Sequence, residues 1–181
     1  MTISLTPQLQ ALTFCPYLDA EGRVTASELA GQVGIYAIFD QAQTLCYVGF
    51  SRDIYFSLKQ HLVVQPEHCY WFKFHTVQRP NRTELQALKQ QWLVETNSTA
   101  IAAAAHEAAW ATTIDARQWI TPTEQAEYDA ADEQGKRRCL KQLARRIEAE
   151  RLQQLASRGV NMPCRFDPKL KEQGLLALKA G

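Results

Sequence analysis

The stretch from Val33 to Leu62 constrains the fold of this chain more than any other part of the sequence. It holds two short runs rich in aromatic and β-branched residues, VGIYAIFD from Val33 and LCYVGFS from Leu45, separated by a polar turn. Such a pair predicts an antiparallel hairpin. Asp53 is placed to cap a following helix, in which apolar residues recur at every fourth position: Ile54, Leu58 and Leu62. We therefore expect a hairpin followed by a helix with one apolar face.

Two motifs in the hairpin, Gly34-Ile35-Tyr36 and Tyr47-Val48-Gly49, resemble the signature of the GIY-YIG nuclease superfamily. Within it, the run is most similar to the nuclease-like N-terminal domain of chloroplast monothiol glutaredoxins and to their stand-alone bacterial relatives. The likeness covers roughly residues 31–109. It implies a small three-stranded antiparallel sheet flanked by helices. The alternative interpretation is a hairpin with two buried tyrosines and two turn glycines.

The remaining elements follow from periodicity and caps. Alternation over 68–77 predicts a third strand, and Thr83 can cap a helix running to about Glu95. An acidic helix is expected to begin at Pro122 and end at Gly135, followed by a basic helix over 136–158. The predicted class is α+β, with three parts: an N-terminal extension (1–31), a GIY-YIG-like domain (32–115) and a helical, basic C-terminal extension (116–181).

Charge and hydropathy limit the classes of function that this chain can have. Residues 1–115 hold seven Lys/Arg and ten Asp/Glu, whereas residues 116–181 hold thirteen and nine. Because lysines and arginines that neutralise phosphates supply much of the affinity for nucleic acids, the nuclease-like part is a poor electrostatic match for DNA unless it carries a local basic patch. No apolar run reaches the length of a membrane span, and the N-terminus lacks a secretory signal.

The five cysteines are scattered and form no Cys-x-x-Cys pair. This pattern predicts neither a zinc site nor a dithiol motif, and it fits reduced thiols in a cytoplasm. A redox role for Cys46 or Cys69 is one interpretation. Cysteines in strands are more often small buried hydrophobes, which is the other.

The superfamily resemblance implies particular catalytic groups: tyrosines that position or deprotonate water, a helix carboxylate that binds one divalent metal, and an arginine that holds the scissile phosphate. Tyr36 and Tyr47 match the tyrosines. Counting from Gly49, however, places Ser57 at the arginine position, and Lys89 falls at the position of the metal-binding glutamate. Serine supplies no positive charge, and a charged lysine has no lone pair for a metal.

These two departures predict a catalytically degenerate protein that acts as a binding or assembly module and needs no cofactor. The alternative is a weak DNA endonuclease that uses Tyr36 and Tyr47 with Mg²⁺ or Mn²⁺. A purely structural role for both tyrosines, with their hydroxyls bonded to backbone groups, also remains open.

The predicted basic helix is the second candidate surface. Arg137, Lys141 and Arg145 recur at every fourth position, beside an apolar stripe. Such a pattern is typical of a solvated helix packed on its own domain. The alternative is a docking surface for RNA, DNA or an acidic protein, so the partner is either an unknown protein or a nucleic acid.

Overall fold

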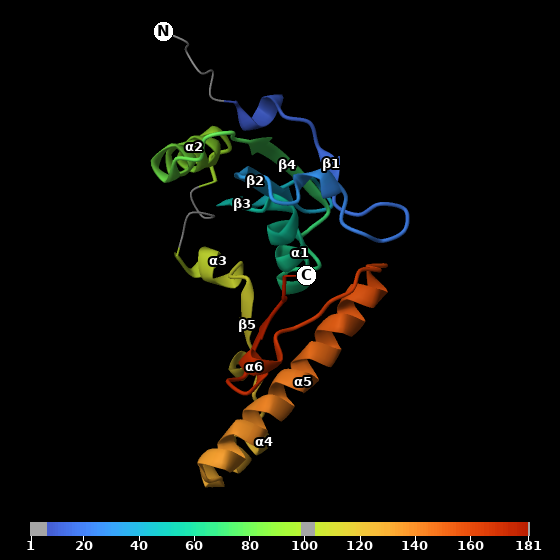
Figure 1. Cartoon of the computed structure of the whole chain (residues 1–181), viewed down its shortest axis with the longest axis vertical. Helices are drawn as coiled ribbons and strands as arrows, with labels where there is room; N and C mark the ends of the chain where they lie inside the picture. Colours follow the sequence, from blue (N-terminus) through green and yellow to red (C-terminus); the bar gives the residue numbers. More distant parts are fainter. Residues whose placement is uncertain (1–6, 99–103, 181) are drawn as a thin grey trace. The chain divides into compact units, whose positions relative to one another are not determined.

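The computed structural model describes residues 7–98 and 104–180, and the chain divides into two compact units, 1–111 and 112–181. Figure 1 shows the elements of both units along the sequence. Each unit has buried residues of its own and is described by itself. In the described ranges, no helix combines the length and the apolar composition needed to cross a bilayer.

The first unit contains a four-stranded antiparallel sheet in the order β1-β4-β2-β3. Its strands are β1 (Cys15–Pro16), β2 (Gly34–Phe39), β3 (Leu45–Ser51) and β4 (Trp71–Thr76). The predicted α+β class is confirmed, but the expectation of three strands is wrong by one. The additional strand, β1, is only two residues long and contains a proline, so it has no alternating pattern to detect.

Helices cover both faces of this sheet (Figure 1). On one face, Ile35, Ala37 and Phe39 of β2 belong to a buried cluster with residues of α2 (Arg82–Glu95). On the other face, Tyr36 reaches α1 (Ile54–Val64). All six residues of β2 are buried because the strand is central and covered on both sides.

The caps of the two helices differ in how well they were predicted. The Asp53 side chain accepts a hydrogen bond from the Phe56 N–H, as a cap of α1 should. In α2 the cap is Asn81, whose side chain accepts from the backbone N–H of Thr83, and not Thr83 itself. A short helix, α3 (Ala104–Ala109), and two 3₁₀ turns, η1 (Leu9–Ala11) and η2 (Ser27–Leu29), complete the described elements of this unit.

The second unit is built around one long helix, α5 (Glu133–Ser157), in which Leu143, Ala144, Ile147 and Leu155 are buried. The other elements of this unit are β5 (Thr113–Asp115), the 3₁₀ turn η4 (Ala116–Trp119), α4 (Pro122–Ala130), α6 (Pro168–Lys171) and β6 (Leu175–Ala177). Strand β5 pairs with β6, so Thr113–Asp115 join the second unit although they fall within the predicted range 32–115.

The junction between α4 and α5 differs from the prediction. Helix α4 begins as expected, with Thr121 and Glu124 forming a capping box, but it stops at Ala130. Gly135 does not end it; its N–H donates to the Asp132 side chain, which caps α5. The Asp132 cap therefore starts α5 before the glycine that was expected to end the preceding helix.

Candidate functional site

The strand register brings the two motif tyrosines together. Tyr36 lies opposite Gly49, and Ile38 lies opposite Tyr47 in the β2–β3 ladder. Residues opposite each other share a face of the sheet, so both tyrosines project from the same side. Their ring centroids are 6.3 Å apart.

The motif glycines are required by this packing. A Cβ on Gly49 would lie 2.6 Å from a ring carbon of Tyr47 and 3.0 Å from Tyr36 Oη. A Cβ on Gly34 would lie 2.2 Å from the backbone oxygen of His75. The distances of 2.6 Å and 2.2 Å are shorter than real contacts allow, so each motif needs a residue without a side chain at its glycine position.

Helix α1 contributes a histidine to the tyrosines. His61 is 2% exposed, and a hydrogen bond of 2.9 Å joins its Nε2 to Tyr36 Oη. Burial lowers the pKa of His61 to about 4, against a smaller opposing effect of the Trp110 backbone. Its Nδ1 has no well-formed hydrogen bond in the described part of the chain. His61 is therefore neutral at physiological pH.

Trp110 covers this group of rings. Its ring stacks on Tyr47 at a centroid distance of 5.1 Å and an interplanar angle of 12°, and it lies 5.7 Å from the ring of His61. Trp110 is 4% exposed and Tyr36 is 3% exposed. We call Tyr36, Tyr47, His61 and Trp110 the tyrosine cluster. Three of its rings are buried, and Tyr47 is half-buried under the Trp110 ring.

Helix α3, which leads into Trp110, is fastened to the sheet and to the region of α1 by polar contacts. His106 Nε2 donates to the Cys46 carbonyl of β3 at 2.6 Å. The Gln65 side chain donates to the Ala109 carbonyl at 2.8 Å. These contacts hold the segment over the tyrosines on two sides.

The hydroxyls of the tyrosines are poor bases in this setting. Burial, with a further contribution from Tyr47, raises the pKa of Tyr36 well above its usual value. Burial and then the charge of Glu107 raise the pKa of Tyr47. A general base works best when its pKa lies near the operating pH, so both phenols stay protonated and neither is suited to deprotonate water.

The two positions that depart from the superfamily pattern have structural partners. Ser57 is buried, and its hydroxyl donates to Ser51 Oγ at 2.7 Å, next to the start of α1. The Lys89 ammonium forms an ion pair with Glu107 and lies 5.9 Å from the centre of the Tyr47 ring. The carboxylate that acts on Tyr47 is thus neutralised by the lysine that stands where the resemblance expects a metal ligand.

The donor set does not fit a catalytic divalent metal. Within residues 7–98 and 104–180, no group of three or more His, Cys, Asp or Glu side chains is arranged to hold an ion. Glu107 is already engaged by Lys89, and a hard cation such as Mg²⁺ favours free oxygen ligands. No reaction step through a metal follows from these residues.

The cysteines named from the sequence are not activated thiols. Cys69 is fully buried. Burial, and to a smaller extent the charge of Asp40, raise the pKa of Cys46 to about 11. Because the thiolate is the reactive form, this environment favours the interpretation of Cys46 as a packing residue.

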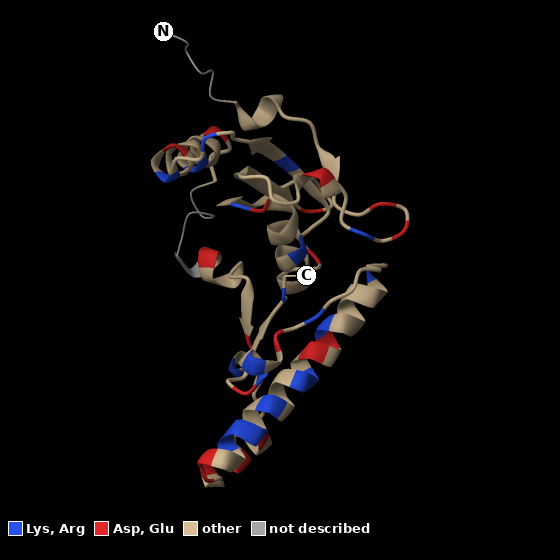
Figure 2. Cartoon of the chain, viewed as in Figure 1, with Lys and Arg blue, Asp and Glu red and all other residues tan. Residues whose placement is uncertain are grey.

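The predicted basic residues all lie on α5 of the second unit. Arg137 and Arg145 are exposed, and Lys141 forms an ion pair of 3.3 Å with Glu172. Figure 2 shows the basic residues distributed along this helix. The tyrosine cluster and the basic helix thus belong to different units.

The sequence analysis missed His61, Glu107 and Trp110. A signal for His61 was present, because it lies seven residues after Ile54 and so falls on the apolar face of α1. Glu107 and Trp110 follow an alanine-rich stretch without periodicity. Residues 99–103 of that stretch lie outside the described ranges.

No family model matches the sequence. The chain is similar to the bifunctional monothiol glutaredoxin-S16, chloroplastic, of Arabidopsis thaliana, with 33% identity over 92 residues. The matched region makes up 51% of this chain and 29% of that protein, so the chain spans less than a third of the relative's length. The similarity is consistent with a relationship in sequence to this monothiol glutaredoxin, whereas the GIY-YIG assignment stays a prediction.

Proposed function

We propose that this chain is a catalytically degenerate protein with a GIY-YIG fold that acts as a binding or assembly module in the cytoplasm. One observation carries the proposal: Lys89, at the position of the expected metal carboxylate, is paired with Glu107 beside Tyr47. An ammonium group there repels a cation and occupies the carboxylate that could have replaced the missing ligand.

Two further features support this proposal. Ser57 provides no positive charge for a scissile phosphate, and a fixed cation is worth several kcal/mol to a phosphoryl transition state, on the order of what one oxyanion-hole donor supplies. Trp110 stacks on Tyr47 and leaves little of the cluster open to solvent. A phosphodiester would have to displace that ring to reach the phenols.

The partner under this proposal is an unknown protein or a nucleic acid that binds the basic helix through Arg137, Lys141 and Arg145. The monothiol glutaredoxin similarity makes a protein linked to thiol chemistry one candidate.

The decisive experiment is a nicking assay on supercoiled plasmid with Mg²⁺ and, separately, Mn²⁺. We expect no conversion to open circles above that seen with a mock preparation. A matched sample of Tyr36→Phe protein controls for contaminating nucleases, because such activity survives the substitution.

The second candidate is a weak metal-dependent endonuclease that uses Tyr36 and Tyr47. The presence of a carboxylate, Glu107, within electrostatic reach of Tyr47 favours it. Robust cleavage that is lost in Tyr36→Phe and in Glu107→Gln would establish this candidate and refute the degenerate module.

A further inference from the structure

We propose that the exposed face of α5 is a binding surface for the phosphate backbone of nucleic acids. The face consists of Arg137, Arg138, Lys141 and Arg145, and we call it the α5 basic face. This inference rests on the proposed function and deepens it, because it assigns a chemical class to the partner of the module.

The side chains of the arginines of this face are exposed. Those of Arg137, Arg138 and Arg145 form neither an ion pair nor a hydrogen bond within residues 7–98 and 104–180. By contrast, Arg146 of the same helix bonds Glu124, Glu150 and the Trp119 carbonyl. The free arginines are thus a property of one face and not of the whole helix.

The acidic residues of α5 do not balance this charge. The helix has three carboxylates, and each faces a different cation: Glu133 pairs with Lys136, Glu148 with Lys171, and Glu150 with Arg146. Lys141 is the one member of the α5 basic face with a partner, Glu172, and that contact of 3.3 Å is itself exposed. An exposed pair of this kind contributes little to stability, so Lys141 can exchange its partner for a phosphate.

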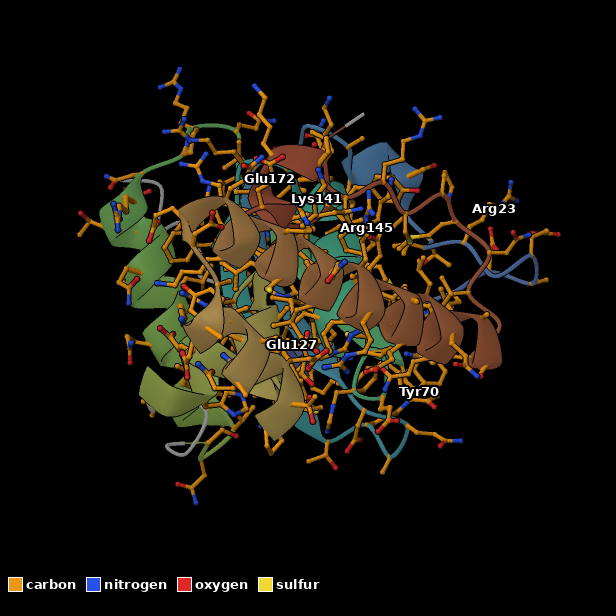
Figure 3. All side chains as sticks on the ribbon, turned by 90° about the horizontal axis from the view of Figure 1, so that it is seen from below. Arg23, Tyr70, Glu127, Lys141, Arg145 and Glu172 are labelled. Carbon is orange, nitrogen blue, oxygen red and sulfur yellow. The ribbon has the colours of Figure 1, made fainter. Side chains whose placement is uncertain are left out.

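Helical spacing gathers these side chains on one side. Arg137, Lys141 and Arg145 follow one another at intervals of four residues, and Arg138 precedes Arg145 by seven. Residues three or four apart in a helix are neighbours on its surface. Figure 3 shows Lys141 and Arg145 on one side of α5, near Glu172, with Glu127 of α4 on the other side. Glu127 of α4 therefore lies away from the α5 basic face.

The arrangement has no structural benefit that the fold explains. Like charges four residues apart in a helix destabilise it, and the apolar side of α5 is secured by Leu143, Ile147 and Leu155. Glutamine at the exposed positions would keep the helix without the repulsion. A row of cations in which three of the four side chains lack a counter-charge suits an anionic partner.

Three of the four cations of this face are arginines, the residue that proteins favour for phosphate and nucleic-acid recognition. The planar guanidinium binds a phosphate through two parallel hydrogen bonds and is less strongly hydrated than an ammonium. The contacts involve the backbone and not base edges, so we expect binding without sequence preference and with strong salt dependence.

The test uses the full chain in EDTA, so that cleavage cannot interfere. Fluorescein-labelled single-stranded RNA, single-stranded DNA and duplex DNA of mixed sequence are titrated, and anisotropy gives the affinity at several KCl concentrations. The variant is Arg137→Gln/Arg138→Gln/Arg145→Gln. The matched control is Arg52→Gln/Arg79→Gln/Arg82→Gln, which removes the same charge from exposed positions of the first unit.

We expect the α5 variant to weaken binding of at least one probe by about tenfold or more at low salt, and to reduce the slope of log affinity against log salt by roughly two. The control should bind like the unaltered protein. Equal losses in both variants would show that only net charge matters, and unchanged binding in the α5 variant would overturn the proposal outright.

A polyglutamate probe tests the remaining possibility, that the α5 basic face binds an acidic protein. Binding of this probe that requires the α5 arginines, without binding of any nucleic acid, would assign the face to an acidic protein and reject the proposal. Plasmid nicking in the separate metal assay would instead refute the degenerate module and leave the α5 result standing, so the two failures can be told apart.

Discussion

At the scale of single residues, the tyrosine cluster shows how a glycine can serve packing where a family resemblance suggests catalysis. Gly49 lies opposite Tyr36, with the Tyr47 ring at its other side. The absent side chain lets the two phenols approach each other and His61. Packing alone therefore accounts for the glycine of this motif.

The substitution Gly49→Ala should lower the free energy of unfolding by about 2 kcal/mol, because an added methyl group would overpack a filled interior. Urea denaturation measures the change. The same substitution in a Tyr47→Leu background tests the cause, since removal of the Tyr47 ring relieves the shortest of the close contacts and should reduce the penalty. Equal penalties in both backgrounds would contradict the packing explanation.

His61 makes the stability of the first unit depend on pH. Its pKa is about 4 in the folded protein and 6.5 in an unfolded chain, so the unfolded state binds more protons between these values. The contribution of neutral His61 to the free energy of unfolding is fully present above pH 6.5. It is lost progressively as the pH falls toward 4. From pH 7 to pH 5 we expect a loss of about 2 kcal/mol.

The measurement is urea denaturation at pH 7 and at pH 5, compared between the unaltered protein and His61→Gln. In His61→Gln, the free energy of unfolding should differ much less between pH 7 and pH 5, whatever the absolute stability of the variant. A difference that persists unchanged in His61→Gln would show that other groups cause it.

At the scale of elements, the sequence predicted the long ones and missed the short ones. The hairpin, α1, α2 and most of α5 have enough residues to display a period and recognisable caps. Strand β1 and helix α3 have too few residues for a pattern, and their positions depend on tertiary contacts such as Cys15 with Phe72. The tyrosines of the site could be identified from their motifs, whereas Trp110 reaches them through a segment without periodicity.

Because Trp110 covers the tyrosine cluster, its substitution should cost more stability than substitution of an exposed tryptophan. Trp110→Ala should cost about 3 kcal/mol, because it removes a buried ring stacked on Tyr47. The matched control is Trp119→Ala, whose ring is 44% exposed and should cost clearly less. Thermal or urea unfolding measures both, and similar losses would argue against a cover that seals the cluster.

At the scale of the whole molecule, the charge of the chain separates by unit. Thirteen of the twenty Lys/Arg residues lie within 112–181, and the tyrosine cluster lies in 1–111. The proposed binding surface and the tyrosine cluster thus belong to different compact units of the chain.

Divalent metal should not stabilise this protein. A ligand that binds only the folded state raises the melting temperature by mass action, so a metal site would reveal itself in a thermal scan. We expect millimolar Mg²⁺ or Mn²⁺ to change the melting temperature by less than about 1 °C. A larger increase that disappears in Glu107→Gln would show that the carboxylate can leave Lys89 for an ion.

The hydrogen bond from His106 to the Cys46 carbonyl has a practical consequence. Strand β3 is the outermost strand of its sheet, and an outer strand with open hydrogen-bonding groups is a template on which other molecules can add. His106 occupies one of those groups. Concentrated solutions of the unaltered protein should therefore form fibrils slowly. We expect a substitution that removes the imidazole of His106 to make fibrils form faster.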